Sequence, residues 1–329
     1  MKASVCYHSG TPAFLEELSR TPEMQRLKGV GMNCGCEYTA FPRFRHLRPY
    51  SRFDHSLGVA RIVWHFTGDT TQSAAALFHD IATPTFAHSV DFLRGDHLRQ
   101  EATEGDTESL IRGSNTICGI LERTGIPVDD VVNYHRYPIA DNDPPGLSAD
   151  RLEYTLGNLE NYRLRAPLVL KLYYQNLIVA QNEYGQQELA FRDPLVAIDF
   201  AYDALDCSRI YVSDEDRYAM QMLSELLERA IRRGVIGESD LMGTEPELIA
   251  KLRLDADCAA DWKQFRSLRK MITVPEKAPV ERRRVIPAKK RCIDPFVAEK
   301  GRLSTFCPEF AEELQAFLTS DQSAWLCAQ

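Results

Sequence analysis

The sequence predicts an all-α body over residues 1–271, followed by a small α+β appendix of short strands over residues 272–329. Two observations lead to this prediction. Apolar residues recur at helical spacing through most of the first 271 residues. The segment ITVPEKAPVERRRVIPAKKRCIDPFV, residues 272–297, contains prolines that would break a helix, with short β-branched runs between them. We expect the appendix to pack on the body or to lie at an oligomer interface.

Helical spacing is clearest over residues 55–67, where four residues share one stripe: His55, Val59, Ile62 and Phe66. Residues 72–80 are apolar nearly all round, which predicts a short helix buried on every side. The same spacing predicts further helices over 103–124, 148–161, 166–183, 193–209, 214–234 and 255–271. In the appendix we expect two or three short strands with exposed basic side chains within 272–297, then a helix at about 308–319.

The composition is that of an ordinary globular protein: 329 residues, 44% hydrophobic, 26% charged, with a formal net charge of −8. An acidic balance argues against extensive nucleic-acid binding, because phosphate backbones attract basic surfaces. The N-terminal MKASVCYHSG lacks the apolar core of a signal peptide, and no stretch approaches the ~18 apolar residues of a membrane span. Nine cysteines without a CxxC pair are typical of reduced thiols. We therefore expect a cytoplasmic protein that binds no membrane.

The segment ALFHDIATPTFAHS, residues 76–89, carries the most informative residues. An apolar run leads directly into the adjacent residues His79 and Asp80, which predicts that both are buried. Burying an ionised carboxylate is costly unless it is paired or coordinated. His55 opens an earlier helix and Asp150 opens a later one. Two imidazoles and two carboxylates suit one divalent transition metal (Mn, Fe, Co, Ni or Zn) better than Ca²⁺, which prefers oxygen ligands alone. The sequence thus predicts a metal centre able to polarise a phosphoryl group.

The pattern H…HD…D, with the flanks RFDHSLGVARI and FHDIATPTFAHSVDF, resembles the HD-domain metal-dependent phosphohydrolases. Within them it looks most like the deoxynucleoside triphosphate triphosphohydrolase branch, which MQRLKGVGM (24–32) and SRIYVSDEDRYAMQMLSELLERA (208–230) also resemble. The resemblance implies the HD-domain helical fold and the metal ligands His55, His79, Asp80 and Asp150. It also implies that His88 and Asp91 act as a pair near the leaving group or the attacking water. Mg²⁺ is an additional ion that the substrate could bring.

Substrate contacts are suggested by the residues and by the resemblance together. Arg52 would lie at the positive end of a helix, where phosphate is favoured. Asp150, Tyr154 and Asn158 fall at i, i+4 and i+8, on one helix face. In the family, the positions of Arg52, Arg151 and Tyr154 contact the phosphates and sugar of a nucleotide. The resemblance also implies that the positions of Asn158 and Asn33 read the sugar, and their neutral polar side chains leave ribose and deoxyribose both open.

The sequence departs from this branch at two histidines: Thr83 replaces one after the HD pair, and Gln100 replaces one before Glu101. Neither residue can carry the positive charge of an imidazolium. Three hypotheses therefore stand. The first is a triphosphohydrolase-like enzyme acting on a nucleotide or a related phosphorylated molecule. The second is a nucleoside monophosphate phosphatase or phosphodiesterase on the same metal, and the third is a non-catalytic nucleotide-binding module.

The basic strip ERRRVIPAKKR, residues 281–291, has two interpretations. The resemblance links this region to oligomer interfaces and regulatory nucleotides, and we expect a homo-oligomer. Charge on an exposed strand also keeps it soluble. Of the two, we favour the solvated strand.

Overall fold

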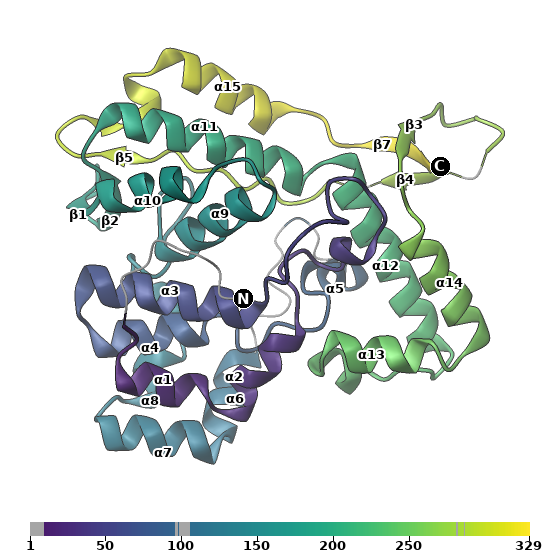
Figure 1. Cartoon of the computed structure of the whole chain (residues 1–329), viewed down its shortest axis with the longest axis horizontal. Coiled ribbons are helices and arrows are strands. Elements are labelled where there is room, and N and C mark those ends of the chain that lie inside the picture. The colour runs from purple at the N-terminus through teal and green to yellow at the C-terminus, as the bar shows by residue number, and fades with distance from the viewer. Residues whose placement is uncertain (1–9, 96–97, 99–105, 281, 286) are drawn as a thin grey trace.

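A computed structural model describes residues 10–95, 98, 106–280, 282–285 and 287–329. The described chain is mainly helical, with a few short strands (Figure 1), so the predicted helical class is confirmed. The helices in chain order are α1 (Ala13–Ser19), α2 (Pro22–Arg26), α3 (Arg52–Thr67), α4 (Thr70–Phe78), α5 (His88–Leu93), α6 (Thr107–Gly113), α7 (Asn115–Thr124), α8 (Val128–Val131), α9 (Ala149–Asn161), α10 (Pro167–Asn176), α11 (Pro194–Tyr211), α12 (Asp214–Arg232), α13 (Glu245–Leu252), α14 (Ala256–Arg266) and α15 (Pro308–Thr319).

The strands form two small sheets. They are β1 (Leu177–Gln181), β2 (Gln187–Phe191), β3 (Met271–Thr273), β4 (Arg283–Val285), β5 (Phe296–Val297), β6 (Gly301–Arg302) and β7 (Ala324–Ala328). The first sheet has the order β1-β2-β5-β6, in which β2 and β5 are parallel and the other pairs antiparallel. The second has the order β3-β7-β4 and is antiparallel. Because β5 pairs with β2, the C-terminal segment joins a sheet that begins within the helical body.

Three predicted helices need correction. The helix expected over 103–124 is two, α6 and α7, because Ser114 leaves the helical conformation and accepts a hydrogen bond from the amide of Ile117. The helix expected over 166–183 ends at Asn176, and Leu177–Gln181 instead pairs with β2 as β1. The helix expected over 255–271 ends at Arg266, and Met271 begins β3. The terminal helix predicted at 308–319 coincides with α15.

Apolar packing holds α3 and α4 from two sides. One cluster joins α3 to α9, α10 and α11 and includes Ile62, Leu156 and Phe200. A second joins α3 and α4 to α1 and α7 and includes Leu77 and Leu121. Figure 1 shows α9, α11 and α15 above this pair, with α1, α7 and α8 below it. The ends of α3 and α4 that carry His55 and His79 are therefore fixed by two cores at once.

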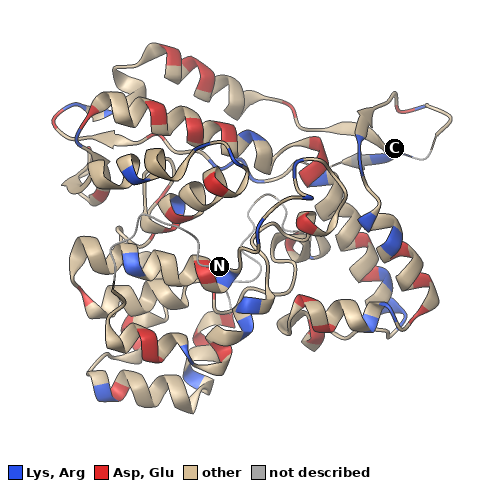
Figure 2. Ribbon diagram, in the orientation of Figure 1, with Lys and Arg blue, Asp and Glu red and all other residues tan. Residues whose placement is uncertain are grey.

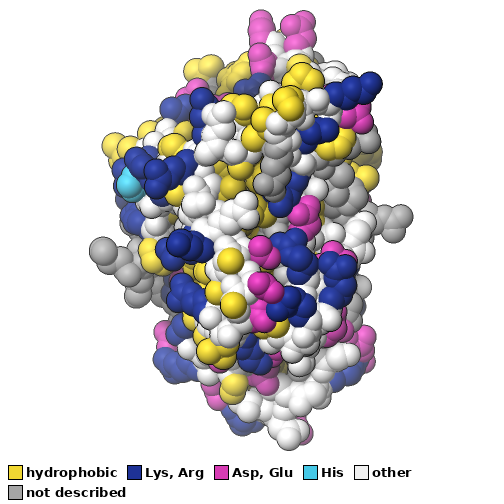
Figure 3. All heavy atoms as spheres, turned by 90° about the vertical axis from the view of Figure 1, so that its right-hand side faces the viewer, with side chains coloured by type: hydrophobic (Ala, Val, Ile, Leu, Met, Phe, Trp, Pro, Cys, Tyr) yellow, Lys and Arg dark blue, Asp and Glu magenta, His cyan; other side chains and the backbone are white. Residues whose placement is uncertain are grey.

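Charged side chains of both signs are spread over the ribbon (Figure 2). On the face that carries α13 and α14, basic and acidic groups are interspersed with apolar ones and do not form one continuous basic surface (Figure 3). Among the described residues, no helix has the length and apolar character that crossing a membrane would require.

Candidate functional site

Local sequence signals place the first histidine. Ser51 caps α3: its Oγ accepts from the amide of Asp54, and the Asp54 carboxylate accepts from the amide of Ser51. This capping box, expected from the SRFD sequence, sets the first turn of α3. His55, one turn further on, is 1% exposed and points towards the end of α4.

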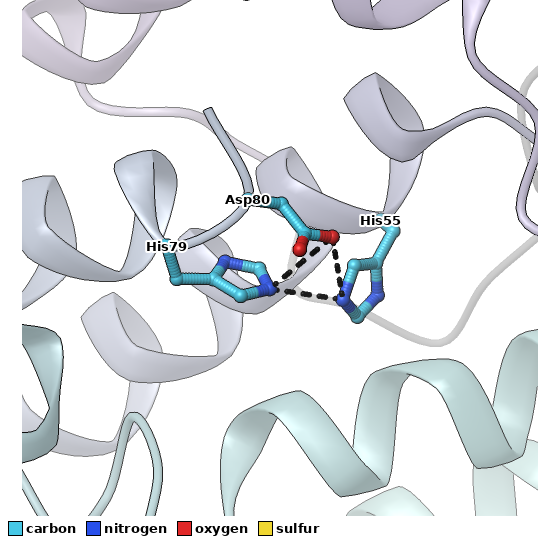
Figure 4. Close-up of side chains that lie close together, drawn as sticks. All are labelled: His55, His79 and Asp80. Atoms are coloured by element: carbon cyan, nitrogen blue, oxygen red, sulfur yellow. Dashed lines mark hydrogen bonds and ion pairs between the residues drawn. The ribbon is translucent and has the colours of Figure 1, made fainter. Parts of the chain in front are cut away.

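The second histidine and its neighbouring carboxylate lie where α4 ends. His79 is the C-terminal cap of this helix, and Asp80 follows in a turn. The Nε2 atoms of His55 and His79 lie 3.1 Å apart, and Oδ2 of Asp80 lies 3.8 and 3.6 Å from them (Figure 4). Asp150, in the first turn of α9, brings Oδ1 to 3.0 Å from Nε2 of His55 and 3.6 Å from Nε2 of His79. The structure thus gathers all four predicted ligands.

The far side of each imidazole is anchored. Nδ1 of His55 lies 2.5 Å from Oε2 of Glu153, and Nδ1 of His79 lies 2.7 Å from the carbonyl oxygen of Ala76. Both Nδ1 atoms can donate to these acceptors, which leaves each Nε2 lone pair directed to the shared centre. Ligand atoms of His55, His79 and Asp80 lie within 4.8 Å of one another. This donor set fits a divalent transition ion.

The pKa values of the cluster show how strongly its charged groups interact. Burial by itself lowers the pKa of His55, but the hydrogen bonds with Asp150 and Glu153 outweigh burial and raise it to about 10. Burial by itself raises the pKa of Asp80, yet the charges of Arg52, His79 and His55 hold it well below its ordinary value. Burial by itself also raises the pKa of Asp150, but the hydrogen bonds with His55 and His79 hold it well below its ordinary value, so both aspartates are charged at neutral pH. The second proton of His55 takes the place of a cation among these groups, and a metal would have to displace it, because a ligating imidazole is neutral.

Asp80 is held by two further side chains. Arg52 Nη1 donates to Oδ2 at 2.8 Å, and Thr83 Oγ1 donates to Oδ1 at 3.0 Å. Arg26 donates to the carbonyl oxygens of Ile81 and Thr83, both at 2.8 Å, and so fixes the turn that follows Asp80. Thr83, one of the two positions where the sequence departs from the branch it resembles, thus orients the Asp80 carboxylate. The other departure, Gln100, and the neighbouring Glu101 lie outside the described residues.

A cavity of about 230 Å³ adjoins the cluster, and most of the predicted site residues line it. Its lining includes the four ligands together with Asn33, Arg52, His88, Arg151, Tyr154 and Asn158. Asp91 does not line it but lies behind His88, fully buried, with Oδ2 2.8 Å from Nδ1 of that ring. Arg151 is paired with Asp141 at 3.2 Å.

Two hydrogen-bonded pairs of polar side chains line the cavity. Asn33 Oδ1 accepts from the hydroxyl of Tyr162 at 3.1 Å, and Asn158 Nδ2 donates to the hydroxyl of Tyr211 at 2.9 Å. Oδ1 of Asn158 is buried without a partner among the described residues. An acceptor in this position suits a hydroxyl group of a ligand. Asp216 also lines the cavity, and burial raises its pKa to about 7.

The expectation of a wholly solvated basic strip at 281–291 is wrong at its C-terminal end. Lys289, Lys290 and Arg291 line the cavity, and Nη2 of Arg291 lies 3.0 Å from Nε2 of His88. Earlier in the strip, Arg283 pairs with Glu225 at 3.0 Å and its side chain is 17% exposed. The strip folds inwards because Ile293, two residues after Arg291, packs into the core beside α9 and α11.

Glu153 and Arg291 escaped the sequence analysis. Glu153 lies on α9, one turn after Asp150, and is 1% exposed. Gly58 on α3 makes room for it: a Cβ there would lie 2.6 Å from Oε1 of Glu153. The sequence signal for Glu153 was a glycine on α3 opposite a glutamate on α9. This signal can be recognised only when it is known that the two helices pack together.

Replacing Gly58 by alanine should therefore weaken metal binding ~10- to 100-fold, the usual cost of disturbing the partner of a ligating histidine. The added methyl group displaces Glu153 from His55, although alanine by itself favours a helix. The measurement is a metal titration by calorimetry. Gly119→Ala in α7 is the matched control, because its Cβ would meet only the flexible end of Arg123. Equal metal affinity in the two variants would contradict the proposed role of Glu153.

The fold and the site define a mainly helical protein with a cluster of two buried histidines and two half-buried aspartates. No protein-family model matches the chain. The chain is 27% identical over 327 residues to the metal-dependent phosphohydrolase cns2 of Cordyceps militaris, covering 93% of this chain and 88% of that protein. It is 25% identical over 240 residues to the uncharacterized protein YdhJ of Bacillus subtilis, covering 73% and 70% of the two chains. It is also 30% identical over 157 residues to the uncharacterized protein YwfO of Bacillus subtilis, a shorter match that covers 42% of this chain and 34% of that protein.

Proposed function

We propose that this chain is a metal-dependent phosphohydrolase of the HD type that acts on a nucleotide, with chemistry like that of the triphosphohydrolases. One observation carries the proposal: two imidazole Nε2 atoms and two carboxylates converge at the floor of a cavity lined by arginines and lysines. Similarity to a metal-dependent phosphohydrolase over nearly the whole chain supports the class of reaction.

The ligands His55, His79, Asp80 and Asp150 would hold the metal, which when bound supplies Lewis-acid stabilisation to a phosphoryl group. Arg52 lies at the N-terminus of α3, where the helix dipole also favours an anion. Arg151 and Tyr154, both on α9, line the cavity. We expect them to contact the phosphates and sugar of the substrate, and we expect Asn33 and Asn158 to contact the sugar.

The proton of the attacking water is assigned to His88. A guanidinium has no acceptor, so Nε2 of His88 accepts from Arg291 and Nδ1 carries the proton that Asp91 accepts. Burial and the charge of Arg291 lower the pKa of His88 to about 4, so the ring is neutral at pH 7. In the reaction, the water oxygen bonds to phosphorus while its proton passes to Nε2. The bond from phosphorus to the leaving oxygen breaks, and that oxygen takes a proton from solvent.

The test is to incubate the protein with Mn²⁺ and ribo- and deoxynucleoside mono-, di- and triphosphates, and to separate the products by ion exchange. Nucleoside and inorganic triphosphate are the expected products. Orthophosphate from monophosphates, or opening of a phosphodiester, would instead identify the second candidate. Binding without turnover in every reaction would contradict an enzyme and leave a binding module.

The second candidate, a monophosphatase or phosphodiesterase, is favoured by the role of Thr83. Its hydroxyl is committed to Asp80, so this position offers no positive charge to a polyphosphate chain. A substrate with a single phosphate needs fewer cations than a triphosphate does.

A further inference from the structure

Arg291 differs from the other cations of the cavity in its partners. Arg52 pairs with Asp80, and Arg151 pairs with Asp141. Lys290 turns away and donates to the carbonyl oxygens of Leu318 and Ser320 at 2.7 and 2.5 Å. No carboxylate of the described residues lies within ion-pair distance of Arg291, whose guanidinium instead contacts the neutral ring of His88.

The backbone that carries Arg291 is held on both sides. Before it, the amide of Ala288 donates to Oε1 of Gln322 at 3.1 Å, and Ala288 is 4% exposed. After it, Ile293 is buried in the core, and the amide of Asp294 donates to the carbonyl oxygen of Pro145 at 3.0 Å. This segment connects β4 to β5 and passes close to α11 (Figure 1). A fixed backbone therefore presents to the cavity a guanidinium that has no charged partner in the described part of the chain.

We propose that Arg291 binds a phosphate group of the substrate and, until that group arrives, covers the Nε2 atom of His88. The proposal rests on the proposed function, because it assigns a phosphate ligand and a gating contact within that site. A guanidinium binds phosphate through charge-assisted, commonly bidentate hydrogen bonds, which are about twice as strong as neutral ones. A phosphate in the cavity should therefore draw Arg291 from the neutral imidazole and uncover Nε2.

The electrostatic consequences agree with this exchange. His88 faces Arg291, Asp91 and Arg52, and after burial the charge of Arg291 is the largest influence that lowers its pKa. The same positive charge acts on Tyr154 and Asp216 across the cavity. When Arg291 moves to a phosphate, the added negative charge offsets its own. The pKa of His88 then rises from about 4 towards the ordinary value of ~6.5, and the ring becomes a better base.

The experiment compares the full chain with Arg291→Gln and with Lys300→Gln, a control that removes one charge from an exposed position outside the cavity lining. The pKa of the His88 imidazole is measured by ¹⁵N NMR across pH in each protein. Neither variant alters Asp80 or another proposed metal ligand. In the parent and the control, inorganic phosphate should raise the pKa of His88. In Arg291→Gln that pKa should be raised already, and phosphate should not change it.

Phosphate affinity provides the second measurement. Arg291→Gln should bind inorganic phosphate ~10- to 100-fold more weakly than Lys300→Gln, and the KM for a hydrolysed nucleotide should rise by a similar factor. Equal phosphate affinity in the two variants, or an unchanged pKa of His88, would overturn the proposal. If no nucleotide is hydrolysed, the proposed function fails, whereas the phosphate-dependent change at His88 still decides the role of Arg291.

Discussion

Replacing Asp80 by alanine is expected to remove the bound divalent metal and to lower turnover by ~10³-fold or more. Asp80 contacts Arg52, at the start of α3, and Thr83, in the turn after α4. Its Oδ2 atom also faces the Nε2 atoms of both histidines. Without it, the site loses one of its four ligands and one of its two anionic ligands, so the metal should bind much more weakly. Metal content by mass spectrometry and hydrolysis under identical conditions are the two measurements.

The alanine variant carries a risk, because Arg52 is 7% exposed and would lose its charged partner. An unpaired buried charge costs ~3–5 kcal/mol, enough to unfold a marginal protein. Asp80→Asn keeps the volume and the acceptor for Arg52 but not the charge, so it serves as the second variant. A melting curve for each shows whether the fold survives. A folded variant that keeps its metal and its turnover would show that Asp80 is not a ligand.

How much of the site was predictable depends on the range of the interactions. The capping box at Ser51 and the face of α9 that carries Asp150, Tyr154 and Asn158 follow from spacing within one helix. The convergence of His55 with the HD pair needs the fold, and the resemblance supplied it. For these residues the sequence was sufficient.

Non-local pairing explains what was missed. Glu153 belongs to a helix of mixed polarity, and nothing local shows that it faces a histidine of α3. Leu177–Gln181 has an apolar spacing that suits a helix as well as a strand, and only its pairing with Gln187–Phe191 decides between them. Arg291 lies in a run of basic residues that is typical of a solvated strand, yet burial of Ile293 turns it inwards. In each case the deciding contact is far away in the sequence.

The second large effect is expected at His88, where replacement by alanine should lower turnover ~10²- to 10⁴-fold while metal content stays unchanged. His88 contacts Asp91 and Arg291, and no hydrogen bond or ion pair among the described residues joins it to the four ligands. Loss of metal from His88→Ala would therefore contradict the separation of the two roles. Asp91→Asn keeps the acceptor for Nδ1 but not its charge, and should lose less activity than His88→Ala does.

The direction of proton transfer can be tested in the same variant. The contact with Arg291 makes Nε2 an acceptor, and a pKa of about 4 leaves almost no imidazolium at pH 7 to act as an acid. A base that takes the proton of water acts equally for every leaving group, whereas an acid is needed less as the leaving oxygen becomes more acidic. The loss in His88→Ala should thus be the same for an alkyl phosphate ester and for a nitrophenyl ester. If the nitrophenyl ester were hydrolysed almost as fast by the variant as by the parent, His88 would be the acid, and its ring would have to be protonated when substrate is bound.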